Sequence, residues 1–161
     1  MLLRSCAGTA ICERRRKQNR NGKENHGGTE GTEGCRQKMK HEDITKRIIG
    51  SAIEVHKHLG PGLLESIYER CLDYEFSLSG LKSERQKQVL VYYKDLELDA
   101  DLRADFVVEN KVVVELKAVD AVHDVHRAQV LTYMRLAGCN VGLLINFNVE
   151  KLTKGTERFV L

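Results

Sequence analysis

The stretch RADFVVENKVVVELK, residues 103–117, decides how this chain folds and where its chemistry lies. Its alternation of side chains on both sides of Glu109-Asn110 predicts two β-strands joined by a tight turn. The apolar residues that alternate along them are Leu102, Ala104, Phe106, Val108, Val112, Val114 and Leu116. Because successive side chains of a strand point to opposite faces, Asp105, Glu115 and Lys117 should emerge together, opposite the apolar set.

The length of the connecting loop follows from this parity. Residues directly opposed on two strands lie on the same face. A two-residue turn would pair Asp105 with Val114, on the wrong face, whereas a three-residue loop of residues 109–111 pairs Asp105 with Glu115. We therefore predict a three-residue loop or a bulge, with Asn110 the residue best able to adopt a left-handed conformation.

The remaining elements follow from hydrophobic periodicity and from Gly and Pro breaks. Helices are expected over 44–59, 64–78 and 122–137, and strands over 89–93, 98–108, 112–117, 141–147 and, at a sheet edge, 158–161. The turn between the first two strands is expected at Lys94-Asp95. The order ααβββαβ predicts an α/β fold with a mixed sheet flanked by helices.

Residues 1–38 differ in composition from the rest. They contain the basic run Arg14-Arg15-Arg16-Lys17 and a Gly/Thr/Glu tract over 25–34 that lacks apolar residues. The first forty residues carry a net charge of +6 and the remainder −3. We expect a disordered basic, Gly-rich tail. The alternatives are a nucleic-acid-binding arm and an upstream extension of a reading frame that starts at Met39. The folded domain is expected over 41–161.

Cysteine usage and hydropathy indicate the compartment. The five cysteines form no CxxC pair, so neither a disulfide framework nor a zinc knuckle is indicated. No run of about 18 apolar residues occurs, so we expect no membrane span. A cytoplasmic location follows as the expectation.

Asp105, Glu115 and Lys117 form a candidate hydrolytic site. Two opposed carboxylates repel each other when empty and become favourable around a hard cation such as Mg²⁺ or Mn²⁺. A bound metal lowers the pKa of its water, and a nearby lysine stabilises charge that develops on a phosphate. The competing interpretation is the solvated face of an ordinary sheet.

Three further residues are candidates. Gln129 and Tyr133 are four apart, so they share one face of the expected helix, where Gln129 interrupts an apolar side that includes Val125. The alternative is a boundary glutamine with an ordinary partner.

Glu65 lies in the first turn of the second helix, in one stripe with Tyr68 and Glu69, where a carboxylate also suits the helix dipole. His123 and His126 could hold zinc, but the sequence offers no third ligand.

These motifs occur in the order Gly62-x-x-Glu65-x-x-Tyr68, Asp105, Glu115-x-Lys117, Gln129-x-x-x-Tyr133 and Gly142-Leu-Leu-Ile-Asn-Phe147. The series resembles the GxxExxY protein family, which is grouped with the PD-(D/E)xK nuclease-like superfamily, over residues 40–161. Ala104 replaces the superfamily's proline before the aspartate.

The resemblance implies a restriction-endonuclease-like αβββαβ core with an extra N-terminal helix. It also implies that Asp105 and Glu115 bind Mg²⁺, that Lys117 is the catalytic lysine and that Glu65 reaches the site. Gln129 and Tyr133 resemble the Gln-x-x-x-Tyr element of RecB-like nucleases. We therefore expect a metal-dependent phosphodiester hydrolase acting on nucleic acid, with DNA favoured. The alternatives are a catalytically silent nucleic-acid- or protein-binding module and a purely structural domain.

Overall fold

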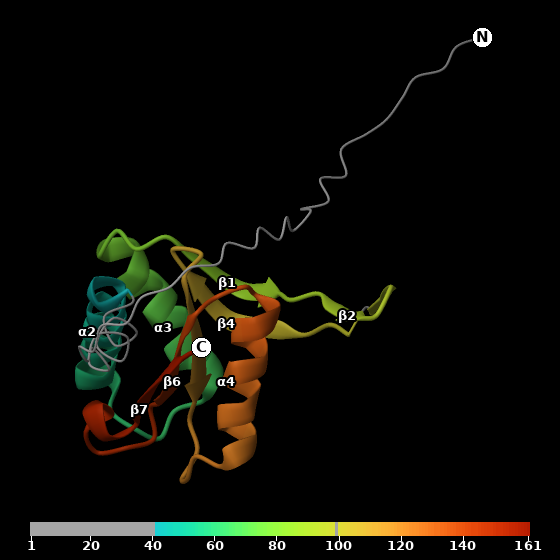
Figure 1. Ribbon diagram of the computed structural model, residues 1–161. Coiled ribbons are helices and arrows are strands. Elements are labelled where there is room, and N and C mark those ends of the chain that lie inside the picture. Colours follow the sequence, from blue (N-terminus) through green and yellow to red (C-terminus); the bar gives the residue numbers. More distant parts are fainter. Residues whose placement is uncertain (1–40, 99) are drawn as a thin grey trace, which may run out of the picture. The chain divides into compact units, whose positions relative to one another are not determined.

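The computed structural model describes residues 41–98 and 100–161 (Figure 1). The helices and strands are, in chain order, α2 Glu42–Leu59, α3 Glu65–Leu78, β1 Ser83–Gln88, β2 Val91–Tyr93, β3 Leu96–Leu98, β4 Arg103–Val108, β5 Val112–Lys117, α4 Asp124–Leu136, β6 Val141–Asn146, the 3₁₀ helix η1 Leu152–Lys154 and β7 Thr156–Val160. The predictions for the tail 1–38 and for a start at Met39 lie outside the described residues. Within those residues, no helix is both long and apolar enough to span a bilayer.

A five-stranded sheet forms the centre of the domain, in the order β1-β4-β5-β6-β7. β5 and β6 run parallel, and the other neighbours are antiparallel. Parallel strands need a crossover connection, and α4 supplies it between β5 and β6. The arrangement confirms the predicted mixed α/β fold with a flanked sheet, and β7 is the expected edge strand.

Two apolar cores lie on opposite faces of the sheet. The helix-pair core lies between the sheet and α2 and α3, and includes Leu72, Phe76, Phe106 and Val114. The α4 core lies on the other face and includes Val107, Val113 and Met134. Figure 1 shows the helix pair and α4 on opposite sides of the strands. Because both faces are covered, the polar residues of β4 and β5 do not lie on an open solvated face.

Gly142 allows α4 to approach β6 closely. A Cβ at this position would lie 2.5 Å from the Met134 sulfur and 2.8 Å from a Val130 methyl carbon. Any side chain here would push the helix away from the strand. The packing of α4 on the sheet therefore depends on Gly142. The sequence pattern had placed this glycine in a buried strand without indicating its contact with the helix.

The strands before β4 correct the sequence prediction. The strand that pairs with β4 is β1, whose sequence SERQKQ has no apolar residue and was not predicted. The expected strands 89–93 and 98–108 are instead divided among β2, β3 and β4. β2 and β3 form a separate two-stranded hairpin around the predicted turn, and Tyr92, Tyr93 and Leu96 are exposed on it.

Candidate metal and phosphodiester site

The two central strands separate at Asp105. β4 and β5 pair through Phe106–Val114, Val107–Val113 and Val108–Val112, which confirms the three-residue loop 109–111. Both Glu109 and Asn110 have left-handed φ values, of 54° and 53°. Beyond Phe106 the ladder ends, and the Asp105 carboxylate enters the opening, where its Oδ2 accepts a hydrogen bond of 2.8 Å from the Leu116 amide. We call this opening the strand fork.

The face alternation changes at the same point. Leu102 and Ala104 pack with the α4 core, whereas Phe106 and Val108 pack with the helix-pair core. The prediction that these four residues share one face is therefore wrong. The alternation is therefore broken at Asp105, where the pairing of β4 with β5 also ends.

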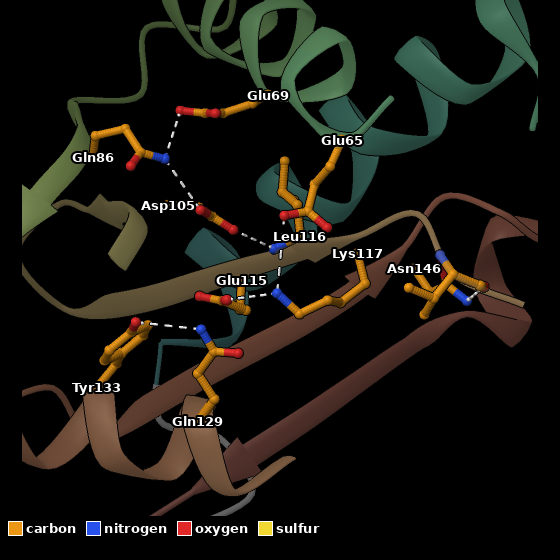
Figure 2. A network of polar contacts seen from close by, with 11 residues as sticks. Glu65, Glu69, Gln86, Asp105, Glu115, Leu116, Lys117, Gln129, Tyr133 and Asn146 are labelled. Atoms are coloured by element: carbon orange, nitrogen blue, oxygen red, sulfur yellow. Dashed lines mark hydrogen bonds and ion pairs between the residues drawn. The ribbon is translucent and has the colours of Figure 1, made fainter. Parts of the chain in front are cut away.

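Glu115 and Lys117 lie side by side at the strand fork (Figure 2). The Lys117 ammonium is 2.7 Å from Glu115 Oε1 and 3.9 Å from Glu65 Oε1. Only 3% of the Glu115 side chain and 12% of the Lys117 side chain are exposed, whereas Glu65 is 42% exposed. The strands thus hold a buried ion pair, and the partly exposed Glu65 carboxylate of α3 lies at the edge of the site.

The carboxyl groups of the site resist ionisation. Burial raises the pKa of Glu115 to about 7, and the neighbouring Asp105 charge adds to the effect. Burial likewise raises the pKa of Asp105 and that of Glu65. Burial alone would lower the pKa of Lys117, but its hydrogen bond to Glu115 and the surrounding carboxylates raise it. Lys117 is therefore protonated at neutral pH. Its single positive charge does not balance the three neighbouring carboxylates of Glu65, Asp105 and Glu115.

A divalent cation would meet this deficit. Among the described residues, Glu115 Oε2 is the one buried side-chain polar atom without a hydrogen-bond partner. Residues 41–98 and 100–161 contain no group of three or more His, Cys, Asp or Glu side chains gathered as metal ligands. Mg²⁺ is commonly held by only one or two carboxylates, with water and substrate phosphate completing its shell. The oxygen donors of Asp105 and Glu115 fit such an ion.

The comparison with known families agrees with this geometry. The sequence profile of the PD-(D/E)XK nuclease superfamily matches residues 42–159. The chain belongs to this superfamily. No match was found among curated proteins or among solved structures. In this PD-(D/E)XK domain, Ala104 stands before the aspartate and is fully buried in the α4 core. The finer resemblance to GxxExxY proteins stays a prediction.

Tyr68 of the Gly-x-x-Glu-x-x-Tyr motif is a core residue that fixes the start of α3. Its ring stacks on Phe147 with centroids 4.4 Å apart, and its hydroxyl donates to Gly60 O at 2.6 Å. The same hydroxyl accepts a hydrogen bond of 3.1 Å from the Leu63 amide. The tyrosine thereby holds the loop that leads into Glu65, the first residue of α3.

The α4 side of the site is less connected than predicted. Gln129 is half-buried, and its amide donates to the Tyr133 hydroxyl at 3.3 Å. Among the described residues, no hydrogen bond or ion pair joins either side chain to the acids or to Lys117. Of the predicted apolar side, Val122 and Leu136 pack against the α4 core, but Val125 is 68% exposed, so that prediction is wrong at Val125. The buried side carries Val130, Tyr133 and Met134.

Two residues that contact the site were not assigned to it from the sequence. The Gln86 amide donates to Asp105 Oδ1 at 3.2 Å and to Glu69 Oε1 at 2.9 Å. Glu69 follows Glu65 by one helical turn, so helical spacing already placed the two acids on one stripe. Nothing in the polar sequence of β1 indicated Gln86, because its contact depends on strand pairing.

Asn146 anchors the chain that follows Lys117. It is 2% exposed, and its side chain accepts from the Val119 amide at 3.1 Å and donates to the Val119 carbonyl at 2.8 Å. Because Asn146 pairs with Lys117 across β5 and β6, these bonds fix the end of β5.

The two histidines at the start of α4 have a capping role, in which His126 Nδ1 accepts a hydrogen bond of 3.2 Å from the His123 amide.

Proposed function

We propose that this PD-(D/E)XK domain is a Mg²⁺- or Mn²⁺-dependent nuclease that hydrolyses phosphodiester bonds, with DNA as its substrate. The observation that carries the proposal is the unpartnered, buried Glu115 Oε2 beside Asp105 and Lys117. A buried carboxylate oxygen without a donor is costly and calls for a cation. The family assignment supports nuclease-like chemistry independently.

Asp105 and Glu115 are the proposed metal ligands, and Glu65 is a further ligand acting directly or through water. When bound, the cation supplies a water of lowered pKa and polarises the phosphate. Lys117, held at 2.7 Å by Glu115, orients that water and offsets charge that develops on the phosphate. Gln129 and Tyr133 support the site or contact the nucleic-acid backbone.

The charge of the domain favours an enzyme over a passive binding surface. Residues 41–161 carry a net charge of −3, whereas a non-specific nucleic-acid surface is basic. Acids neutralised by metal at the strand fork would suit contact with a phosphate. We place the enzyme in the cytoplasm as part of the same proposal.

A cleavage panel tests the proposal. Single- and double-stranded DNA and RNA are incubated with the full chain and Mg²⁺ or Mn²⁺, alongside Lys117→Ala purified identically. We expect metal-dependent cleavage of DNA by the wild-type chain that is lost in Lys117→Ala. Cleavage retained by that variant would point to a contaminant, and binding in EDTA without any cleavage would indicate a silent binding module.

A further inference from the structure

Gln86 has a backbone conformation that is unusual for the interior of a strand. Its φ is +49°, although it lies between paired residues of β1. A left-handed φ is disfavoured for a residue with a Cβ and occurs inside strands mainly where the surrounding structure enforces it. Such a residue at the edge of a polar site calls for an explanation in terms of that site.

The position of Gln86 in the sheet supplies part of the explanation. β1 and β4 pair through Arg85–Phe106 and Lys87–Ala104, so the same register sets Gln86 opposite Asp105. No backbone pair forms at this position. The interruption on the β1 side of β4 thus coincides with the strand fork on its β5 side, and Asp105 is released from both neighbours.

The amide of Gln86 has a defined orientation. One nitrogen donates both to Glu69 Oε1, at 2.9 Å, and to Asp105 Oδ1, at 3.2 Å. Both hydrogen bonds are donated by the amide nitrogen to carboxyl oxygens, so the nitrogen and not the oxygen of the amide faces the two acids. Glu69 is 14% exposed at its side chain and lies 3.6 Å from Arg85 Nε, which holds this anchor in place.

Asp105 consequently receives one hydrogen bond on each oxygen. Leu116 donates to Oδ2 at 2.8 Å, and Gln86 donates to Oδ1. Two donors from different strands fix the rotation of the carboxylate, while each oxygen keeps a lone pair for a further ligand. Partners of this kind around a metal-binding carboxylate orient it and strengthen metal binding.

We propose that Gln86 is a positioning residue that holds Asp105 in the orientation required for divalent-metal binding, with Glu69 anchoring its amide. The inference rests on the proposed function, because it assumes that Asp105 is a metal ligand. The left-handed backbone of Gln86 is the strained feature that directs its side chain between the two acids. Glu69 acts through Gln86 and is not itself a ligand in this account.

The test is a titration of the metal-free full chain with Mn²⁺, without nucleic acid, followed by electron paramagnetic resonance of the free ion. Gln86→Ala should weaken Mn²⁺ binding by about 10- to 100-fold, the usual effect of losing a partner of a metal ligand. Gln88→Ala is the matched control, because Gln88 lies on the same strand and is exposed. It should bind like the wild-type chain.

A second variant separates the side chain from the strained backbone. Gln86→Gly tolerates a positive φ but lacks the amide. It should lose as much Mn²⁺ affinity as Gln86→Ala while its metal-free melting temperature equals or exceeds that of Gln86→Ala. Recovery of wild-type affinity in Gln86→Gly would overturn the proposal, because the backbone and not the amide would then matter.

Glu69→Ala completes the test. If Glu69 acts through Gln86, the loss it causes in the wild-type background should shrink in the Gln86→Ala background. Full additivity would overturn the anchoring role. Binding that is lost in Asp105→Asn but unchanged in Gln86→Ala would overturn the role of Gln86 alone. A wild-type chain that binds no Mn²⁺ would overturn both this inference and the proposed function.

Discussion

The two sides of the strand fork differ in how they contact its acids. On the side of α3 and β1, Glu65 approaches Lys117 and Gln86 links Glu69 to Asp105. On the side of α4, Gln129 and Tyr133 bond to each other. The first side is organised around ions, and the second around apolar packing. Helical spacing placed Gln129 beside Tyr133, but it did not reveal that Gln86, on a strand, is the glutamine that reaches a carboxylate.

Replacement of Lys117 has the largest expected effect and applies to both sides of the fork. Lys117→Ala should reduce cleavage by about 10²–10³-fold, the usual effect of removing a donor that stabilises transition-state charge. Single-turnover cleavage measures it. Mn²⁺ binding should persist, because Asp105 and Glu115 remain. Equal cleavage rates in the two identically purified proteins would point to a contaminant and would remove the catalytic role of Lys117.

Glu115→Gln should change the pH dependence of stability. The pKa of Glu115 is raised to about 7 by burial and by Asp105, so the folded state holds a proton that the unfolded state has lost. The stability that this proton brings is complete below about pH 4.5 and is lost as pH rises through about 7. The variant should therefore exceed the wild-type chain at pH 8 by at most about 3 kcal/mol, and match it near pH 4.

Urea unfolding in EDTA measures this difference. Glu157→Gln is a control of opposite sign, because hydrogen bonding to Arg127 lowers the pKa of Glu157. That variant should lose stability near neutral pH and regain parity as pH falls. A wild-type advantage over Glu115→Gln that grows with pH would contradict the burial argument.

Tyr68→Phe tests how the α3 side is held. The change removes the hydroxyl that joins Gly60 and Leu63, with an expected loss of about 1–2 kcal/mol in the free energy of unfolding. Tyr92→Phe is the matched control, since its hydroxyl bonds to Glu97 on an exposed hairpin. The control should change stability by less than about 0.5 kcal/mol. Equal effects would show that the loop before Glu65 does not depend on the tyrosine.

Gln129→Ala has the smallest expected effect and sharpens the contrast between the two sides. Its one side-chain partner among the described residues is Tyr133, so Mn²⁺ affinity should stay within about two-fold of wild type. The same titration that reports on Gln86 measures it. A ten-fold loss would place α4 among the elements that orient the metal ligands.

Part of this contrast could be predicted from the sequence. Strand parity gave the three-residue loop and the association of Asp105 with Glu115 and Lys117, because alternating apolar residues have to reach a core. The same rule failed at Ala104, which still pairs with β1 but lies beyond the point where β4 stops pairing with β5. Parity describes continuous strands, and the site lies where a strand is interrupted.

The remaining features depend on tertiary contacts. β1 has no apolar residue, so only its pairing with β4 makes it a strand and places Gln86 beside Asp105. The buried side of α4 is selected by its contact with Gly142 rather than by the residues that its own periodicity suggested. A single sequence carries no local signal for either arrangement.

An anomalous difference map from crystals of the full chain grown with Mn²⁺ would show directly whether Asp105 and Glu115 bind a metal. We predict a peak at the strand fork, within coordination distance of the Asp105 carboxylate and Glu115 Oε2. A fully occupied Mn²⁺ elsewhere on the chain, with the fork empty and Glu115 Oε2 bonded to protein, would contradict it.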